Sequence, residues 1–139
     1  RNITRAEFTA LMMRQLGMGE GKYSGAFDDV ASDMWFAGYV QTAYENGIVE
    51  GYAGLFRPQD DISIEEILKV LIESYEKKTA IEQYSENKVH DVSDWAKEYA
   101  QKSAEIGLIT DKEFDLREKS SREIAAALIY RYIEKAGEK

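Results

Sequence analysis

The sequence contains no cysteine, one proline and one histidine in 139 residues. The absence of cysteine excludes disulfides, thiol catalysis and cysteine-based zinc or iron–sulfur sites. No apolar run approaches the roughly 20 residues that a membrane-spanning helix needs, so no insertion into a membrane is expected. No basic segment followed by an apolar one opens the chain, so we expect no signal peptide within it. A single proline is too few for a polyproline linker.

Basic residues are scarce relative to acidic ones, with 18 Lys and Arg against 26 Asp and Glu and a net charge of −8. Surfaces that bind nucleic acid are basic because they neutralise phosphates, so this balance argues against a nucleic-acid partner and against an anionic membrane surface. Hydrophobic residues make up 44% and charged residues 32%, which is typical of a folded globular protein. The length suits one compact domain, or two or three small repeats that share a core.

A short segment is repeated three times along the chain. Aligned on a shared glutamate, residues 3–8, 62–67 and 119–124 are spaced 59 and 57 residues apart. Apolar residues then recur at i, i+3, i+4 and i+8, which is one face of an α-helix. The pattern predicts three equivalent helices, over about 4–16, 63–78 and 120–135. The recurring residues are Phe8, Leu11, Met12 and Leu16, then Ile67, Val70, Leu71 and Tyr75, then Ile124, Ala127, Leu128 and Tyr132.

Each predicted helix opens with the same start signal, a hydroxyl residue three positions before a glutamate. In such a capping box the hydroxyl accepts a hydrogen bond from the N3 backbone N–H, and the glutamate accepts one from the N-cap N–H. Three boxes predict three helix N-termini, and capping alone explains these residues without any ligand. The pairs are Thr4 and Glu7, Ser63 and Glu66, and Ser120 and Glu123.

A second block, which contains a tryptophan, precedes the second and third of these helices. Residues 27–30 correspond to 89–92, and Trp35 corresponds to Trp95. A glycine, Gly47 or Gly107, follows twelve residues after each tryptophan, which predicts a helix of about three turns that ends at a left-handed glycine. The next loop, residues 50–58, has two glycines and a proline and predicts a structured turn with a short extended pairing. Residues 17–25 and 77–88 are predicted connectors.

These ordered motifs resemble the S-layer homology (SLH) module of bacterial cell-surface proteins. Residues 27–67 carry FDDV, W, NGIVEGY, GLFRP and ISIEEI, and the first repeat carries ITRAE, the most diagnostic motif of the family. The resemblance implies an all-α fold, a pseudo-threefold unit with a central three-helix bundle and peripheral helix-loop lobes. It divides the chain into residues 1–26 (the second half of a first module plus a connector), 27–88 (a second module plus a connector) and 89–139 (a third, divergent module), all in one folded unit.

The resemblance also implies a function, non-covalent anchoring of a secreted surface protein to the cell wall or S-layer of a bacterium of the Gram-positive type. Members of the family bind secondary cell-wall polysaccharides, often with a ketal-linked pyruvate, in grooves between modules. Arginine can grip such a carboxylate bidentately, and a helix N-terminus favours an anion. The candidate glycan-binding residues are Thr4, Arg5, Asp29, Trp35, Gly51, Tyr52, Arg57 and Ser63, with Trp95 and Arg122 as weaker candidates.

The same residues also have structural explanations. Large aromatic side chains mostly serve packing, so Trp35 and Trp95 are expected as core anchors more than as sugar platforms. Asp29 suits capping of the following turn as well as contact with a ligand. An isolated Arg5 is more often a solvated surface residue, and Arg57 could simply pair with a local carboxylate.

The sequence departs from the family pattern at the arginine of the first motif. The position of Arg5 holds Ile64 in the second repeat and Ser121 in the third, and Arg122, one residue later, is expected to point about 100° around its helix. Isoleucine cannot bind a carboxylate. We therefore expect at most one or two competent grooves, first of all one formed by Arg5 and the lobe from Trp35 to Arg57.

An enzymatic function is not expected from this sequence. His90 is the only histidine, and no triad order, glycine-rich phosphate loop or metal-spaced histidine pair occurs. The cluster of Asp28, Asp29 and Asp33 lacks the spacing of an EF-hand, so neither a metal nor a cofactor is expected. The competing hypothesis is a protein–protein assembly or spacer module with degenerate grooves, which would self-associate through apolar surface where the first lobe is missing.

Overall fold

A computed structural model describes residues 1–78, 93–110 and 113–137. Its elements are α1 (Arg5–Gln15), α2 (Ala37–Glu45), α3 (Ile64–Lys78), the 3-10 helix η2 (Asp94–Ala96), α4 (Lys97–Ile106) and α5 (Arg122–Ala136). Within these ranges only isolated β-bridges accompany the helices, so the all-α prediction is confirmed. No helix in the described ranges is both long enough and apolar enough to span a membrane.

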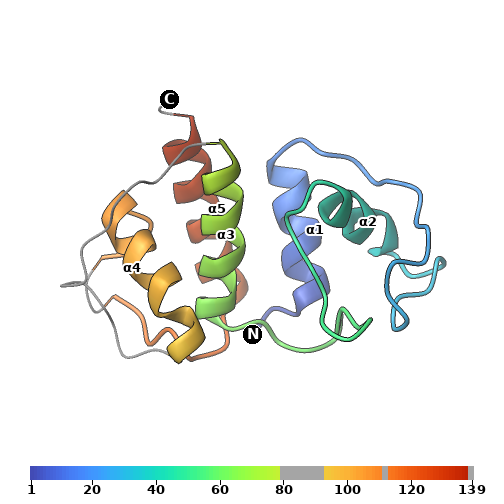
Figure 1. Ribbon diagram of the computed structural model, residues 1–139, viewed down its shortest axis with the longest axis horizontal. Coiled ribbons are helices and arrows are strands. Elements are labelled where there is room, and N and C mark those ends of the chain that lie inside the picture. Colours follow the sequence, from blue (N-terminus) through green and yellow to red (C-terminus); the bar gives the residue numbers. More distant parts are fainter. Residues whose placement is uncertain (79–92, 111–112, 138–139) are drawn as a thin grey trace.

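The three long helices lie at the centre, and the short helices lie outside them (Figure 1). Helix α5 packs against both α1 and α3, while α2 packs on α1 and α4 packs on α3. Each lobe thus covers the long helix that precedes it in the sequence. The predicted central bundle with peripheral lobes is present, and the threefold symmetry of the unit stays a prediction.

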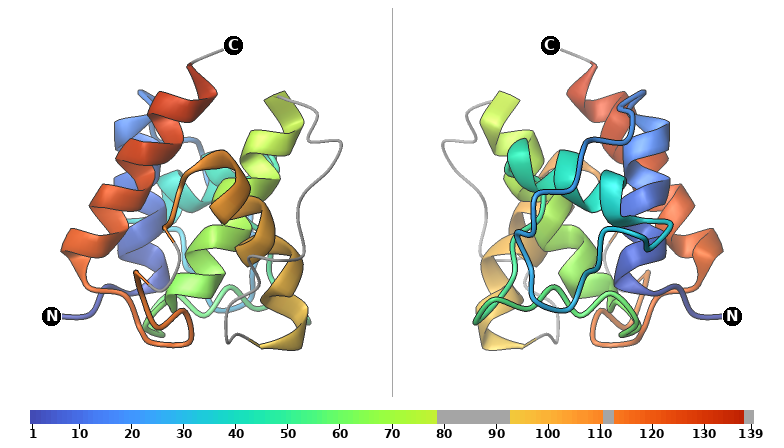
Figure 2. Two further views of the ribbon diagram at one scale, coloured as in Figure 1. Left: turned by 90° about the vertical axis from the view of Figure 1, so that its left-hand side faces the viewer. Right: turned by 90° about the vertical axis from the view of Figure 1, so that its right-hand side faces the viewer.

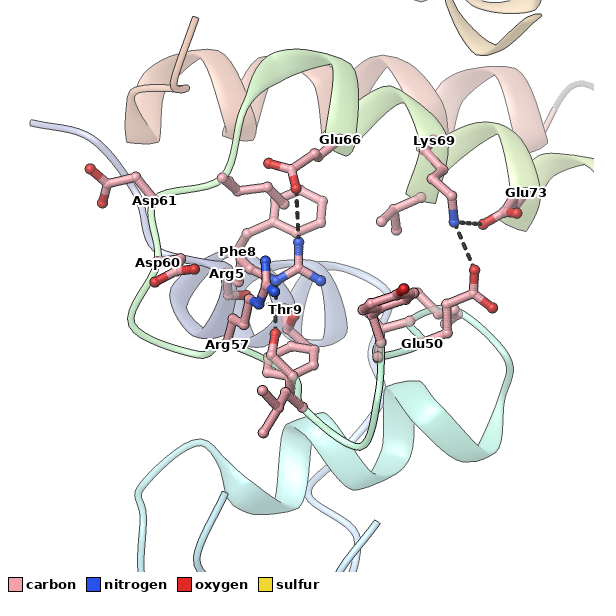
Figure 3. A pocket seen from close by; sticks show the side chains of 18 of the residues that line it. Arg5, Phe8, Thr9, Glu50, Arg57, Asp60, Asp61, Glu66, Lys69 and Glu73 are labelled. Atoms are coloured by element: carbon pink, nitrogen blue, oxygen red, sulfur yellow. Dashed lines mark hydrogen bonds and ion pairs between the residues drawn. The ribbon is translucent and has the colours of Figure 1, made fainter. Parts of the chain in front are cut away.

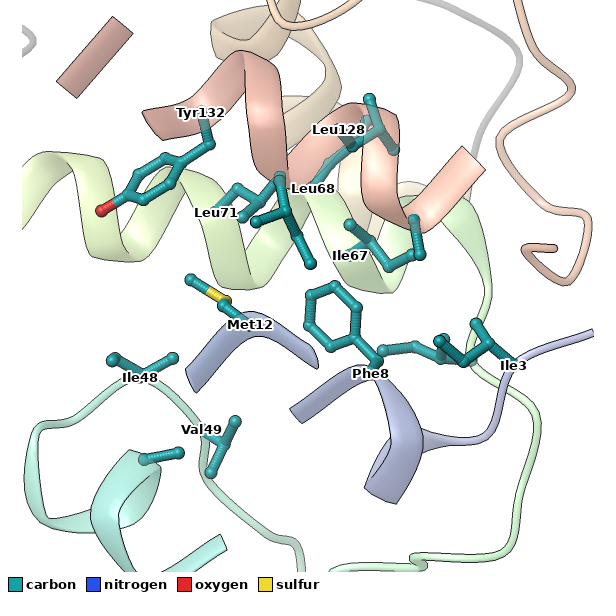
Figure 4. Close-up of a cluster of buried hydrophobic side chains, with 14 of the residues drawn as sticks. Ile3, Phe8, Met12, Ile48, Val49, Ile67, Leu68, Leu71, Leu128 and Tyr132 are labelled. Carbon is teal, nitrogen blue, oxygen red and sulfur yellow. The ribbon is translucent and has the colours of Figure 1, made fainter. Parts of the chain in front are cut away.

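One face of each long helix supplies the core (Figure 4). The central side chains of these three faces are at most 1% exposed, and burial of each stabilises the fold by about 1.5–3 kcal/mol relative to exposure. Ile48 and Val49 follow the turn at Gly47 and join the same cluster, as expected for the apolar pair after the glycine. The central residues are Phe8 and Met12 of α1, Ile67 and Leu71 of α3, and Leu128 and Tyr132 of α5.

The three segments that enter the long helices are bonded to one another in a closed ring. The N–H of Ile3 donates to the carbonyl of Ser120 (2.9 Å), that of Ser120 to Ile62 (2.8 Å), and that of Ile62 back to Ile3 (3.0 Å). All three residues are at most 2% exposed, so their backbone groups need these partners. The ring therefore ties the three helix starts together, as the side views show for the N-terminal segment and the loop into α5 (Figure 2).

Two of the three predicted capping boxes are present. The hydroxyl of Thr4 accepts from the N–H of Glu7 (3.1 Å), and the Glu7 carboxylate accepts from the N–H of Thr4 (3.0 Å). The pair Ser63 and Glu66 makes the same two bonds, at 3.2 and 2.8 Å.

The predicted start of the third long helix is wrong by one residue. Ser121 is the N-cap of α5, and its hydroxyl accepts from the N–H of Ile124 at 3.1 Å. Ser120 instead occupies the place of Ile3 and Ile62 in the backbone ring, which holds it before the helix. Because Ile124 stands where the other helices have a glutamate, this cap lacks the second half of a box.

The lobes follow the predicted pattern of tryptophan, helix and glycine. Gly47 and Gly107 both adopt a positive φ, of 68° and 89°. In the loop of the second repeat, Tyr52 and Leu55 form a bridge with two bonds of 3.0 Å, and the two turn residues between them have positive φ, as in a tight hairpin turn. Most of the predicted connector 77–88, and also His90, lie outside the described residues.

Candidate functional site

A groove of about 540 Å³ lies where the first turns of α1 face α3 (Figure 3). The loop of the second repeat closes one side of it, and the start of the third lobe contributes at the other end. Half of the ten candidate residues from the sequence line the groove. It is also lined by charged residues of α3 that were not among the candidates. The collected candidates are Arg5, Gly51, Tyr52, Arg57 and Trp95.

Arg5 is held on the wall of the groove by three contacts. Its Nε donates to the carbonyl of Phe56 (2.9 Å), its guanidinium lies 5.3 Å from the centre of the Phe56 ring, and its Nη1 pairs with a carboxylate oxygen of Glu66 at 3.2 Å. Only 22% of the side chain is exposed. The solvated-surface alternative for Arg5 is therefore wrong, and its guanidinium is held in one orientation between α1 and α3.

Arg57 lies beside Arg5 in the groove and is positioned by its backbone (Figure 3). Its φ of 63° is in the left-handed region, which costs a residue with a Cβ roughly 1–2 kcal/mol. The carboxylate of Asp29 stabilises this turn by accepting from the N–H groups of Phe56 (2.8 Å) and Arg57 (2.7 Å). Asp29 thus caps the backbone at Phe56 and Arg57 instead of the turn that follows it in the sequence, and it does not line the groove.

The Arg57 side chain is exposed, and no ion pair of its guanidinium occurs within the described ranges. The expected pairing with a local carboxylate is therefore not found there.

Gly51 and Tyr52 serve the groove in different ways. A Cβ at Gly51 would lie 2.4 Å from a ring carbon of Phe27 and 2.5 Å from the carbonyl of Leu55. The glycine is therefore required for packing of the lobe, which is a reason that sequence reasoning did not supply. Tyr52 is 79% exposed, so its ring is available at the rim.

The far end of the groove is occupied by a network of charged and aromatic side chains. The ammonium of Lys69 pairs with Glu50 (2.8 Å) and Glu73 (3.1 Å), and the Tyr99 hydroxyl donates to Glu73 at 3.2 Å. Burial lowers the pKa of Lys69, but the two glutamates outweigh it, so the pKa is raised above its usual value. The Trp95 side chain is 49% exposed, and its ring is tilted by 59° relative to the ring of Tyr99, with the ring centres 6.4 Å apart.

Sequence reasoning missed these charged residues of α3. Their one local signal was the i, i+4 spacing of Lys69 and Glu73. With them, the groove carries nearly equal numbers of positive and negative groups, and its arginines are at one end. The cations are Arg5, Arg57, Lys69 and Lys119, and the anions are Glu50, Asp60, Asp61, Glu66 and Glu73.

The profile of the S-layer homology domain matches residues 26–66, which contain the loop of this groove. The chain belongs to the S-layer homology family. An amylopullulanase of Thermoanaerobacterium thermosulfurigenes is 35% identical over 148 residues, which cover 99% of this chain and 8% of that enzyme. Exoglucanase XynX of Acetivibrio thermocellus is 35% identical over 98% of this chain and 13% of its own length.

A third relative, the middle cell wall protein of Brevibacillus brevis, is 35% identical over 52% of this chain and 7% of its own length. The SLH chain thus spans a small fraction of the relatives it matches. The part that is similar to this chain makes up 8% of the amylopullulanase and 13% of the exoglucanase.

The tryptophans of the SLH lobes are not core anchors, contrary to the expectation from their size. Trp35 is 55% and Trp95 is 49% exposed, whereas the residues that follow them, Phe36 and Ala96, are at most 1% exposed. The neighbouring residue takes the buried place in each lobe. The tryptophan ring therefore lies outside the core.

Trp35 and Thr4 lie in a second cavity, of about 310 Å³, together with Arg1 and Glu7. The guanidinium of Arg14 lies 5.8 Å from the Trp35 ring centre. The predicted groove of Arg5 and the lobe from Trp35 to Arg57 therefore contains the loop of that lobe but not its tryptophan. The lobe covers α1 through α2, so its loop reaches the groove while its tryptophan does not.

Two remaining candidates line neither cavity. Ser63 is 5% exposed, and its hydroxyl is used by the cap of α3. Arg122 is exposed and is the first residue of α5, the position that Arg5 has in α1. The expected rotation of Arg122 by about 100° is therefore wrong, because the helix begins one residue later.

The part of the chain that the structure describes contains no candidate metal site. Among the described residues, no three His, Cys, Asp or Glu side chains come together in a way that could hold a metal ion.

Proposed function

We propose that this SLH chain anchors the protein that carries it to the bacterial cell wall by holding an acidic wall polysaccharide in the groove between α1 and α3. The observation that carries the proposal is the convergence of Arg5 and Arg57, from two separate segments, at one end of the groove (Figure 3). The family match and relatives named as cell-wall and surface-layer proteins support a role at the cell surface.

The arginine end suits a carboxylate such as that of a ketal-linked pyruvate. A guanidinium presents several donors in one plane and bonds a carboxylate through two of them. Arg5 is pre-oriented by its contacts with Phe56 and Glu66, so little conformational freedom is lost when it binds.

The remainder of the groove suits the uncharged part of a glycan. The exposed rings of Tyr52 and Trp95 offer apolar faces with polar edges to sugar rings. The carboxylates of Glu50 and Asp60 line the same groove and can accept hydrogen bonds from sugar hydroxyls. Such contacts are individually weak, but a wall displays many copies of its polymer, which favours attachment through repeated engagement.

The proposed function is binding without a reaction. The names of the enzymatic relatives do not bear on this, because the chain spans 8% and 13% of those two proteins. We place the chain on a secreted protein in the wall or S-layer of a Gram-positive type of bacterium.

Co-sedimentation with purified cell-wall sacculi, with and without their secondary polymers, tests this function. Arg57→Ala removes a positive charge from the groove without removing an ion pair of the described structure. As the control, Lys22→Ala removes a positive charge from an exposed residue that lines neither cavity. Because a hydrogen bond to a charged group contributes about 1.5–3 kcal/mol, we expect Arg57→Ala to weaken binding about tenfold and Lys22→Ala to leave it unchanged. Equal binding of both variants, or no loss after polymer removal, would contradict the proposal.

One observation favours the alternative, an assembly module. Counted from the N-caps Thr4, Ser63 and Ser121, Met13 of α1, Ile72 of α3 and Tyr130 of α5 hold the same position. Met13 and Ile72 are fully buried, but Tyr130 is 63% exposed. Helices α1 and α3 are each packed by the short helix of a lobe, whereas the described residues place no such helix against α5. This open face is the surface through which the chain would self-associate.

A further inference from the structure

Glu66 has two partners, one for each carboxylate oxygen. Its Oε1 accepts from the N–H of Ser63 at 2.8 Å, which caps α3, and its Oε2 accepts from Nη1 of Arg5 at 3.2 Å. The side chain is 32% exposed and lines the groove. Its negative charge therefore lies next to the guanidinium that the proposed function assigns to the acidic group of the glycan.

Capping does not by itself require this second contact. Glu7, the counterpart of Glu66 in α1, also caps its helix, but its other oxygen pairs with Arg1 at 2.8 Å, outside the groove. In α5 the corresponding residue is Ile124. Of these three positions, the one in α3 alone brings a carboxylate into the groove.

The surrounding charges act in the same direction. Lys69, the cation at the far end, already pairs with Glu50 and Glu73. Asp60 and Asp61 line the groove near the arginines (Figure 3). Lys119 is the remaining cation of the groove, but five carboxylates line it against four cations. A second anionic group on a ligand would therefore meet an excess of negative charge beyond the arginine end, and like charges brought together oppose binding.

We propose that Glu66 is a specificity-determining residue of the groove, which orients Arg5 and restricts the ligand to glycans with isolated carboxylates, so that densely charged polyanions are rejected. This inference rests on the proposed function of the same groove. A single ligand carboxylate can share the Arg5 guanidinium with Glu66, because the positive charge of Arg5 offsets the repulsion between the two carboxylates. A phosphate on every repeating unit adds further repulsion from Glu50, Glu66 and Glu73.

The test compares Glu66→Gln with Glu7→Gln. Glutamine keeps one oxygen, which can accept from the Ser63 N–H and preserve the cap, but it removes the charge and the second acceptor oxygen that faces Arg5. Glu7 supplies the same change outside the groove. The probes are the polysaccharide released from Thermoanaerobacterium thermosulfurigenes walls, the same polysaccharide with its carboxyl groups reduced to alcohols, and poly(glycerol phosphate). Calorimetric titration at low ionic strength gives Kd for each, because salt screens the effect.

We expect Glu66→Gln to tighten binding of the native polysaccharide about two- to fivefold. The gain should be larger for poly(glycerol phosphate) and absent for the reduced polysaccharide, and Glu7→Gln should change none of the three. If Glu66→Gln weakens binding of native and reduced polysaccharide alike, or changes neither the native polysaccharide nor the polyphosphate, the inference is overturned.

Two further results separate this inference from the proposed function. If the wild type binds the native polysaccharide and Arg57→Ala does not, while Glu66→Gln fails to tighten binding, the anchoring function stands and the role of Glu66 falls. Absence of wild-type binding overturns both. As a second variant, Glu66→Asp keeps the charge but shortens the reach to Arg5, so binding should weaken, and a gain would contradict the inference.

Discussion

Glu7 illustrates how single residues combine capping with electrostatics. A hydrogen bond from the side chain of Arg1 and another from the backbone N–H of Thr4 lower the pKa of the Glu7 carboxyl from 4.5 to about 2. The folded state therefore holds Glu7 ionised under conditions in which the unfolded chain protonates it. The stability that this group contributes is present above about pH 4.5 and is lost as the pH falls through that value towards 2.

Glu7→Gln should remove this part of the acid sensitivity. We expect the free energy of unfolding of the wild type to fall more steeply than that of the variant between pH 4.5 and 2, by on the order of 1 kcal/mol, since solvent screens the exposed partner Arg1. Urea unfolding curves over pH 2–7 measure the difference. Parallel pH profiles for the two proteins would show that the ion pair does not contribute.

Some residues of the groove could be predicted from the sequence, and others could not. Arg5, Gly51, Tyr52 and Arg57 were found from motifs and do line one groove. Glu66 was assigned to capping alone, because local spacing identifies its bond to Ser63 but says nothing about an arginine 61 residues away.

At the scale of elements, local signals identified all three long helices, because periodicity and caps depend on residues close in sequence. The start of α5 was the exception. Two adjacent serines, Ser120 and Ser121, offered two local solutions, and glutamate alignment favoured the first. The backbone ring with Ile3 and Ile62 selects the second.

The corrected start of α5 predicts unequal effects of two adjacent substitutions. Ser121→Ala should lower the free energy of unfolding by about 1 kcal/mol, the usual contribution of an N-cap hydroxyl. Ser120→Ala should cost less, because within the described ranges its hydroxyl bonds only to the carbonyl of Ser121. Urea unfolding gives the energies, and amide hydrogen exchange at Ile124 should accelerate in Ser121→Ala alone. The reverse order would restore the start inferred from sequence.

The whole molecule brings distant segments together in a way that depends on which helix each lobe covers. Because each lobe packs on the preceding long helix, the groove is formed by α1, α3, the loop of the second repeat and Trp95 of the third repeat. The same arrangement leaves the outer side of α5 without a lobe in the described structure, and it exposes Tyr130.

A substitution on that face tests self-association. If the open side of α5 mediates assembly, the wild type should sediment as a concentration-dependent mixture, and Tyr130→Glu should be monomeric because a charge is costly to bury there. Tyr52→Glu places the same change on an exposed tyrosine of the groove and should leave association intact. Analytical ultracentrifugation distinguishes them. A wild type that stays monomeric throughout would remove support from the assembly alternative.

Family membership, helix content and two of three helix caps followed from the order of residues, because each depends on interactions within one turn or one motif. The composition of the groove did not. Phe36 and Ala96 took the buried places of the two lobes, so both tryptophans lie outside the core. Because each lobe packs on the preceding long helix, Trp95 lines the groove and Trp35 does not. Glu66 gained its contact with Arg5 by the same packing. Such juxtapositions arise from long-range burial and backbone pairing, which no local pattern encodes.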